Sequence, residues 1–414
     1  MRSQFDEIIE RRGTNSLKYD FAAERGKPND VLPFWVADMD FRACPSVTQA
    51  LMKSVEHGIF GYSECREGYF QALKNWYSEY FHWDIQREWL VKTPGVVFAI
   101  CAVIRALTKE GDAVLIQQPV YYPFSESISA NNRKLVNSPL VYADGKYSID
   151  FQDLEEKIVR NKVKLFLLCS PHNPVGRVWT KEELTRVGDM CVRNNVLIIS
   201  DEIHADFTYP GFRHSVFASL KPEYQERTIT CTAPSKTFNL AGLQISNIVI
   251  PNCEMRNQFQ QELVRTGYSQ LNTAGLVACQ AAYEGGRPWL EELKRYLAGN
   301  LEFVRSFLNE RLPQVRLVEP QGTYLLWLDF RSLGLSADRL EDLVTNQAKL
   351  WLDRGELFGE EGAGFERINI ACPRASLEAA LLRLEGAVLQ LSHILATKFD
   401  NTAIMLSHSM VVND

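Results

Sequence analysis

Three polar residues, each following a short apolar run, are the clearest candidates for chemistry. Asn173 comes after the run 163–169, Asp201 ends the run 196–200, and Lys236 follows the run 228–232. The turns around Asn173 and Lys236, "SPHNPVG" and "APSKTFNLAG", are rich in small residues and proline, so the backbone can approach a ligand closely. If the runs are strands of an open parallel sheet, their carboxyl ends form the crevice in which ligands bind.

Together these residue types suit pyridoxal phosphate. A lysine that is buried at a sheet edge has a lowered pKa and can form a Schiff base with an aldehyde. The carboxylate of Asp201 can keep a pyridine nitrogen protonated, and the Asn173 amide can hydrogen-bond the ring's phenolate oxygen. Each residue also has an ordinary interpretation, because asparagine favours turns and aspartate caps helices. The set of three favours the cofactor.

In the middle of the chain, predicted strands and helices alternate as in an α/β domain. Apolar runs at 113–119, 163–169, 196–202, 228–232 and 245–251 predict strands. The segment 180–195 opens with a Thr-x-x-Glu capping pattern and predicts a helix. A strand–helix–strand order requires a right-handed crossover and a mostly parallel sheet.

The 414-residue length favours two domains. We expect an N-terminal arm over 1–45 that contributes to the small domain, and a large α/β domain over 46–288. A smaller α+β domain is expected over 289–396, with a long helix near 289–310, strands in "TYLLWLDF" and "ERINIAC", and a closing helix. Residues 397–414 are an extension to which the sequence assigns no role.

Three motifs, "SPHNPVG", "SDEIH" and "SKTFNLAGLQ", occur in this order along the chain. Through them the chain resembles the fold-type I, class I/II aminotransferase group of pyridoxal-phosphate enzymes. It is similar in particular to the MalY/PatB-type branch of cystathionine β-lyases and cysteine C–S lyases. The marks of that branch are "LPFWVADMDF" (32–41), "GYSE" (61–64), "DEIH" and "RINIACPR" (367–374). The resemblance implies a mostly parallel, seven-stranded-type sheet in the large domain.

The resemblance also assigns roles to individual residues. Lys236 would bind the cofactor covalently and move the substrate Cα proton, and Asp201 would pair with the pyridine nitrogen. Asn173 and His204 would contact the ring oxygen, and Tyr121 would stack on the ring. The amides of Val96 and Val97, with Ser235, would bind the phosphate, and Tyr62 would reach the phosphate of the other subunit. Arg374 would bind the substrate α-carboxylate together with Asn173 and Tyr62. Because Tyr122 is adjacent to Tyr121, either ring can face the cofactor; we favour Tyr121.

Two positions depart from the pattern of many aminotransferases. Those enzymes carry a serine three residues before the lysine and an arginine eight residues after it, whereas this chain has Ala233 and Gln244. Phosphate binding must therefore depend on backbone amides, on Ser235 or Thr232, and on Tyr62. The sequence does not show which side chain replaces the missing arginine.

The resemblance implies a carbon–sulfur β-lyase that cleaves cystathionine or a cysteine S-conjugate to a thiol, pyruvate and ammonia. One alternative is an aminotransferase that passes the amino group to a 2-oxo acid on the same scaffold. A further alternative is a cofactor-loaded regulatory protein that acts by protein–protein contact. The identity of the leaving thiol is not visible in the sequence.

The composition limits the possible partners. The net charge of −6 argues against nucleic acid, and no apolar stretch reaches the roughly 18 residues that cross a bilayer. Nine cysteines occur singly, and the N-terminus lacks an apolar signal region, so we expect a cytoplasmic protein with reduced thiols. No metal-binding pattern such as HExxH is present. The expected partners are a small amino-acid substrate and, through Tyr62, a second copy of the chain.

Overall fold

A seven-stranded sheet forms the centre of the large α/β part of the computed structural model, which describes residues 3–391. Its strand order is β2-β10-β9-β8-β7-β3-β4. The strands are β2 (Leu90–Thr93), β3 (Ala113–Ile116), β4 (Lys134–Asn137), β7 (Leu165–Cys169), β8 (Leu197–Asp201), β9 (Thr228–Thr232) and β10 (Ser246–Val249). The five strands from β4 to β9 are parallel, which confirms the predicted fold class.

One strand of this sheet has a direction that the sequence did not indicate. β10 runs antiparallel to both β9 and β2. The connection from β9 to β10 holds only the four-residue helix α8 (Pro234–Thr237) and a 3₁₀ turn at Ala241–Leu243. A parallel return needs a longer crossover, usually a full helix. The short connection therefore turns the chain back antiparallel, and this same connection carries Lys236.

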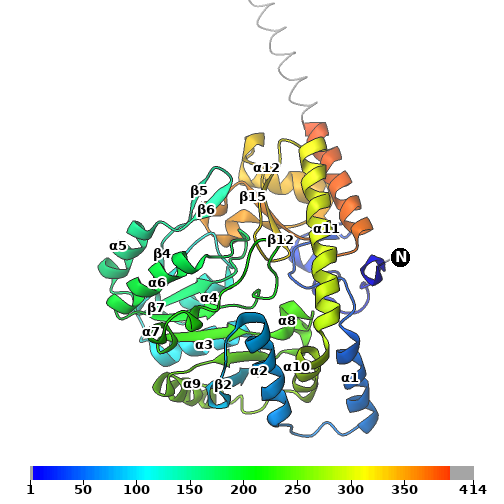
Figure 1. The fold of residues 1–414 in the computed structure, drawn as a ribbon. Coiled ribbons are helices and arrows are strands. Elements are labelled where there is room, and N and C mark those ends of the chain that lie inside the picture. The colour runs from blue at the N-terminus through cyan, green and yellow to red at the C-terminus, as the bar shows by residue number, and fades with distance from the viewer. Residues whose placement is uncertain (1–2, 392–414) are drawn as a thin grey trace, which may run out of the picture.

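Helices cover both faces of the sheet because successive strand residues point to opposite sides. In β3, Val114 and Ile116 pack with α3 (Val96–Leu107), α4 (Pro123–Ala130) and α9 (Cys253–Arg265). Leu115, from the same strand, packs on the other side with α5 (Phe151–Asn161) and α6 (Lys181–Arg193). Figure 1 shows these two helical layers with the sheet between them. Both capping-box residues predicted for the helix near 180 are present, Thr180 and Glu183.

The C-terminal part is built on α11 (Arg287–Arg311), the long helix that crosses Figure 1 vertically. A four-stranded sheet with order β11-β12-β15-β14 packs against it. These strands are β11 (Arg316–Val318), β12 (Leu325–Asp329), β14 (Asp353–Arg354) and β15 (Phe365–Asn369), and a helix covers 374–391. β12, β15 and both helices follow the sequence prediction for this region, whereas β11 and β14 were not predicted.

The N-terminal segment joins this C-terminal part. β1 (Leu32–Pro33) pairs parallel with β13 (Leu350–Trp351), more than three hundred residues later. The remaining elements are α1 (Pro45–His57), α2 (Glu67–Phe81), β5 (Val141–Ala143), β6 (Lys146–Ser148), α7 (Pro222–Gln225), α10 (Thr273–Gly285) and α12 (Ala337–Glu341). No helix within residues 3–391 is long and apolar enough to cross a membrane. The domain boundaries stay predictions, and the extension at 397–414 lies outside the described residues.

Candidate active site

The carboxyl ends of β7, β8 and β9 meet at one edge of the sheet and open into a cavity of about 300 Å³. Register brings Cys169 of β7 opposite Asp201 of β8, and Asp201 opposite Cys231 of β9. All the predicted site residues except Tyr62, Arg374 and the alternative phosphate group Thr232 line this cavity: Lys236, Asp201, Asn173, His204, Tyr121, Val96, Val97 and Ser235. Residues spread over 140 positions of the sequence are thus collected at a single edge.

Lys236 reaches the cavity from α8, the short helix after β9. Its Nζ donates a hydrogen bond to the Ala37 carbonyl at 2.9 Å. Burial, assisted by the positive charge of Arg367, lowers the pKa of Lys236 to about 8. About a tenth of this amine is therefore uncharged at pH 7 and about half at pH 8, and the uncharged form is the one that acts as nucleophile or proton acceptor.

Asp201 lies at the end of β8 and is buried. Its Oδ1 accepts a hydrogen bond from the Ile203 backbone N–H at 3.2 Å. Burial raises the pKa of Asp201 to about 7, although that hydrogen bond and the charge of Lys236 act in the opposite direction. The hydrogen bond and the charge of Lys236 offset only part of the cost of burying this carboxylate. It therefore favours a cationic ligand group beside it, such as a protonated pyridine nitrogen.

His204 supplies a second group without a protein partner. The side chain is buried, and its Nδ1 has no hydrogen-bond partner among the described residues. Burial lowers the pKa of His204 well below its ordinary value, and the charges of Lys236 and Arg367 add to this effect. The ring is therefore neutral and able to share one hydrogen bond with a ligand oxygen.

Asn173 is held in place by an arginine that the sequence interpretation missed. Its Oδ1 accepts from Nη1 of Arg367 at 3.1 Å, and Nη2 of Arg367 donates to the Trp35 carbonyl at 2.7 Å. Nη2 also forms a buried ion pair with Asp353. Arg367 lines the cavity from β15, and its Nε has no partner among the described residues. The sequence feature that could have identified Arg367 is its position as a cation within the predicted strand sequence "ERINIAC".

Arg374 is not in the cavity, so the structure does not support its assignment to the substrate carboxylate. Its Nε donates to Oδ1 of Asn300 at 2.8 Å, and its guanidinium lies 4.9 Å from the centre of the Phe303 ring. Both partners belong to α11. β15 ends at Asn369, and the chain turns before Arg374 begins the last described helix, so this arginine faces α11 rather than the sheet edge.

Tyr62 also lies outside the cavity. It is 94% exposed and belongs to the connection between α1 and α2. Its neighbours Ile59 and Phe60 are exposed as well. The expected contact with the other subunit's phosphate therefore stays a prediction.

The amino terminus of α3 faces the cavity and suits an anion. Pro94, Gly95, Val96 and Val97 all line the cavity, and Gly95 caps the helix. The first N–H groups of a helix have no partner within the helix, and their dipole favours a negative charge. Ser235 and Gln244 line the same cavity, whereas Thr232 gives its hydroxyl to the Asn247 carbonyl. Gln244, at the position of the missing arginine, is a neutral candidate for the phosphate.

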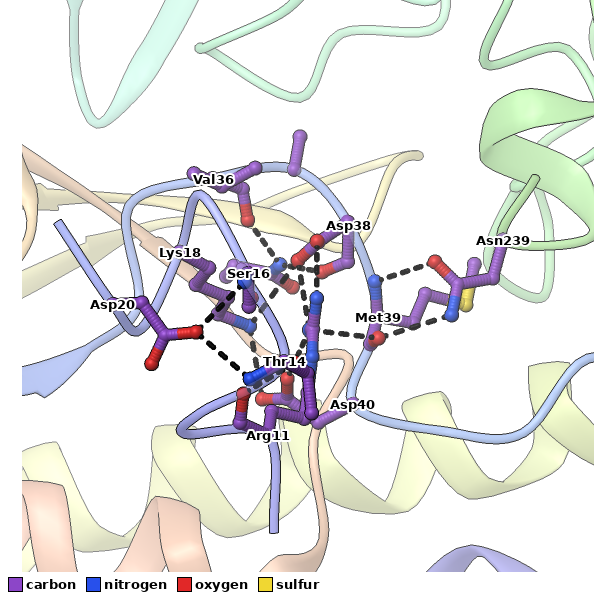
Figure 2. A network of polar contacts seen from close by, with 12 residues as sticks. Arg11, Thr14, Ser16, Lys18, Asp20, Val36, Asp38, Met39, Asp40 and Asn239 are labelled. Atoms are coloured by element: carbon purple, nitrogen blue, oxygen red, sulfur yellow. Dashed lines mark hydrogen bonds and ion pairs between the residues drawn. The ribbon is translucent and has the colours of Figure 1, made fainter. Parts of the chain in front are cut away.

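Trp35, Val36 and Ala37 of the loop 35–40 line the cavity, and a polar network fixes this loop (Figure 2). Nδ2 of Asn369 donates to the Val36 and Asp38 carbonyls at 2.7 and 2.6 Å. Asn239, which lies three residues after Lys236, accepts from the Met39 N–H at 2.9 Å. These bonds hold the Ala37 carbonyl at Lys236. In the sequence, the motif "LPFWVADMDF" (32–41) that contains this loop stood out only through its resemblance to the family.

The arrangement can hold a flat aromatic aldehyde that carries a phosphate. It offers an amine with a lowered pKa, a buried carboxylate, an imidazole nitrogen without a partner among the described residues, and a helix terminus. Tyr121 and Tyr122 both line the cavity, so either aromatic face is available for stacking. Within residues 3–391 no group of three or more His, Cys, Asp or Glu side chains could hold a metal ion.

Comparisons with known proteins agree with this site. A model of the family described as "Aminotransferase class I and II" matches residues 29–384. The chain is 42% identical to "Cystathionine beta-lyase PatB" of Bacillus subtilis (strain 168), over 93% of this chain and 99% of that protein. It is 34% identical to "Protein MalY" of Escherichia coli (strain K12), over 93% and 98%.

Solved structures give the same picture. Cystalysin from Treponema denticola, described as containing a pyridoxal 5'-phosphate cofactor, superposes with a TM-score of 0.90 and 38% identity, covering 94% of this chain and 100% of that chain. A PLP-bound C-S lyase from Staphylococcus hominis superposes with a TM-score of 0.87 and 33% identity, covering 94% and 98%.

Proposed function

Because this chain belongs to the class I and II aminotransferase family, we propose that it is a pyridoxal-phosphate-dependent carbon–sulfur β-lyase. The single observation that carries the lyase assignment is the 42% identity to a cystathionine β-lyase over 93% of this chain. In the proposed reaction, cystathionine and water give homocysteine, pyruvate and ammonia. When bound, the cofactor supplies an electron sink for the carbanion at the substrate Cα.

The residues of the cavity have definite tasks in this reaction. Lys236 would hold the cofactor through its amine and would accept the proton from the substrate Cα. Asp201 keeps the ring nitrogen protonated, because a buried anion there is stable only beside a cation. His204 and Asn173 direct polar atoms to the ring oxygen. The α3 amino terminus, Ser235 and Gln244 bind the phosphate.

Arg367 replaces Arg374 as the proposed binding group for the substrate α-carboxylate. It lines the cavity, and the bond from its Nη1 to Asn173 and the ion pair with Asp353 fix its orientation. A planar guanidinium that is oriented in advance loses little entropy when it binds a carboxylate. Because Lys236 lines the same cavity, a substrate bound at Arg367 would present its Cα proton to that amine.

Transamination is the nearest alternative, because the family to which the chain belongs is described by that reaction. The chain is also 26% identical to an "Aspartate aminotransferase" of Pyrococcus abyssi (strain GE5 / Orsay) over 86% of its length. An assay without any 2-oxo acid separates the two reactions. We expect purified holoenzyme to release pyruvate and free thiol from L-cystathionine in equal amounts. Turnover that requires an added 2-oxo acid would establish the aminotransferase instead.

A homodimer with shared active sites is part of the proposal. Support comes from the exposed apolar side chains of Ile59, Phe60 and Tyr62, which are 72%, 68% and 94% exposed. Such a patch on a globular chain is typical of an interface. Analytical ultracentrifugation should give twice the chain mass, and Tyr62→Ala should weaken cofactor binding. A monomer with full activity would contradict this assembly.

A further inference from the structure

A second cavity of about 440 Å³ lies next to the first one. The two cavities share three lining residues, Trp35, Tyr122 and Asp353. The three residues form a common wall between the candidate active site and the second space. A substrate that is held by its Cα end in the first cavity could extend past this wall into the second.

The second cavity is rich in positive charge. Its lining includes the cations Arg25, Lys27 and Arg354, against the carboxylates Asp353 and Glu126. Of the two carboxylates, Asp353 is already engaged by Arg367. The lining thus holds three cations and two carboxylates, and the cation that can bind a ligand is the one that has no carboxylate partner of its own.

The three cations differ in how far they are already paired. Lys27 forms an ion pair with Glu341. Arg354 stands 3.6 Å from the Glu356 carboxylate and 3.7 Å from those of Asp338 and Glu341. Arg25 forms no ion pair within residues 3–391, so it is the cation most available to a ligand.

An aromatic stack holds Arg25 at the shared wall. Its guanidinium carbon lies 5.2 Å from the centre of the Trp35 ring. The Trp35 ring stacks on Trp351, with 4.4 Å between centres and 11° between planes. Both tryptophans line the second cavity. A guanidinium that is stacked on an aromatic face keeps its N–H groups free for a carboxylate.

The charges of the second cavity act across the shared wall. Burial raises the pKa of Tyr122, and the charge of Arg25 opposes this rise. Burial also raises the pKa of Asp353, which Arg367 and, more weakly, Lys27 counteract. Charges of the second cavity are thus close enough to influence Tyr122 and Asp353, which line both cavities.

We infer that the second cavity receives the sulfur substituent of the substrate, and that it selects L-cysteine S-conjugates whose substituent ends in a carboxylate, with Arg25 as the main anion contact. This inference rests on the proposed lyase function. Elimination expels the thiol from Cβ, so a site for the substituent must lie beside the site for the Cα end. Where the substituent also carries an ammonium group, Glu126 provides the matching carboxylate.

The test compares two substrates that differ only in the terminal carboxylate, S-carboxypropyl-L-cysteine and S-propyl-L-cysteine. For the holoenzyme we expect kcat/KM for pyruvate release to be about two- to fivefold higher with the carboxylate, the effect of one solvent-exposed ion contact. Arg25→Gln should remove this preference, mainly through a higher KM for the carboxylate substrate. Arg25→Lys should restore part of it.

The matched control is Arg316→Gln, which removes an exposed arginine of β11 that lines neither cavity. It should keep the wild-type preference. If wild-type holoenzyme cleaves neither substrate, the proposed function fails and this inference fails with it. If it cleaves both with equal kcat/KM, or if Arg25→Gln lowers both values by the same factor, the lyase stands and only the inference is overturned.

Discussion

Two lysines that are largely removed from solvent show what distinguishes structural from chemical use of a charge in this protein. Lys18 is 1% exposed, and its Nζ lies 2.9 Å from Asp40 and 3.7 Å from Asp38. Arg11 completes the same cluster, with 2.7 Å to each of these carboxylates (Figure 2). Every charge in this cluster has an opposite charge beside it.

Lys236 is arranged differently. Its hydrogen bond goes to a neutral carbonyl, that of Ala37, and its pKa is lowered to about 8 chiefly by burial. The nearby Asp201 forms no ion pair with it in the described structure. The paired charges around Lys18 neutralise one another and fix the conformation of the chain there. The charges of Lys236 and Asp201 have no ion-pair partner among the described residues, so they stay available to a ligand. The two sites are also connected, because the loop anchored by the first cluster carries the carbonyl that holds Lys236.

The largest effect expected from this comparison is on catalysis. Lys236→Ala removes the proton acceptor, so pyruvate release from L-cystathionine should fall by at least about 10³-fold. Circular dichroism and thermal melting should stay close to wild type, because no ion pair is lost. A variant with wild-type activity would break the distinction between the two lysines.

The reverse result is expected at the structural lysine. Lys18→Met leaves the buried Asp40 with Arg11 as its remaining cation, and we expect the free energy of unfolding to fall by about 3 kcal/mol. Urea denaturation followed by fluorescence measures this change. Lys53→Met, on the exposed face of α1, is the control and should shift the unfolding midpoint little.

The arginine of the cavity should affect substrate binding. Arg367→Lys keeps the charge but loses the planar fork that bonds Asn173 and Trp35. We expect kcat/KM for L-cystathionine to fall by about 100-fold, mostly through KM. Steady-state kinetics over a wide substrate range would show the split. An unchanged KM would exclude Arg367 from carboxylate binding.

A pH profile sharpens the contrast further. Only the neutral amine of Lys236 can react with an aldehyde, and its lowered pKa of about 8 makes it half neutral at that pH. The rate at which apoprotein takes up pyridoxal phosphate should therefore rise about tenfold between pH 7 and 9 and then level off. Borohydride trapping followed by mass spectrometry measures this rate. An increase that continues past pH 10 would indicate an ordinary, solvated lysine.

The smallest effect is expected at Arg374. Its guanidinium contacts Asn300 and Phe303 outside the cavity, so Arg374→Gln should change kcat/KM by less than about twofold. The same steady-state assay serves for Arg367 and Arg374. A loss at Arg374 as large as that at Arg367 would return the carboxylate-binding role to Arg374.

The main parts of the fold and of the site follow from local patterns. Continuous apolar runs predict buried strands, and polar residues directly after such runs must lie at the sheet edge. For this reason the amino-acid order alone is enough to group Asn173, Asp201 and Lys236. Their grouping needs only the direction of the strands, which short-range connections largely dictate.

Other members of the site could not be found in this way. Arg367 and Arg374 occur in one short motif, and the resemblance pointed to Arg374, which lies outside the cavity, whereas Arg367 lines it. The difference depends on where β15 ends and on which neighbour each side chain meets, and those neighbours, Asn173 and Asn300, are far away in sequence. The antiparallel direction of β10 likewise depends on how little helix its connection contains.

The residue types, their order along the chain and the ends of the strands were therefore readable from the amino acids, because hydrophobic periodicity and turn chemistry act over a few residues. The positions of Trp35, Val36, Ala37 and Arg367 in the lining of the first cavity, and of Arg25 in that of the second, depend on the tertiary structure alone. These features join the N-terminal segment to strands more than three hundred residues later, as β1 and β13 do. Contacts of such separation leave no local pattern, since they depend on the packing of the whole chain.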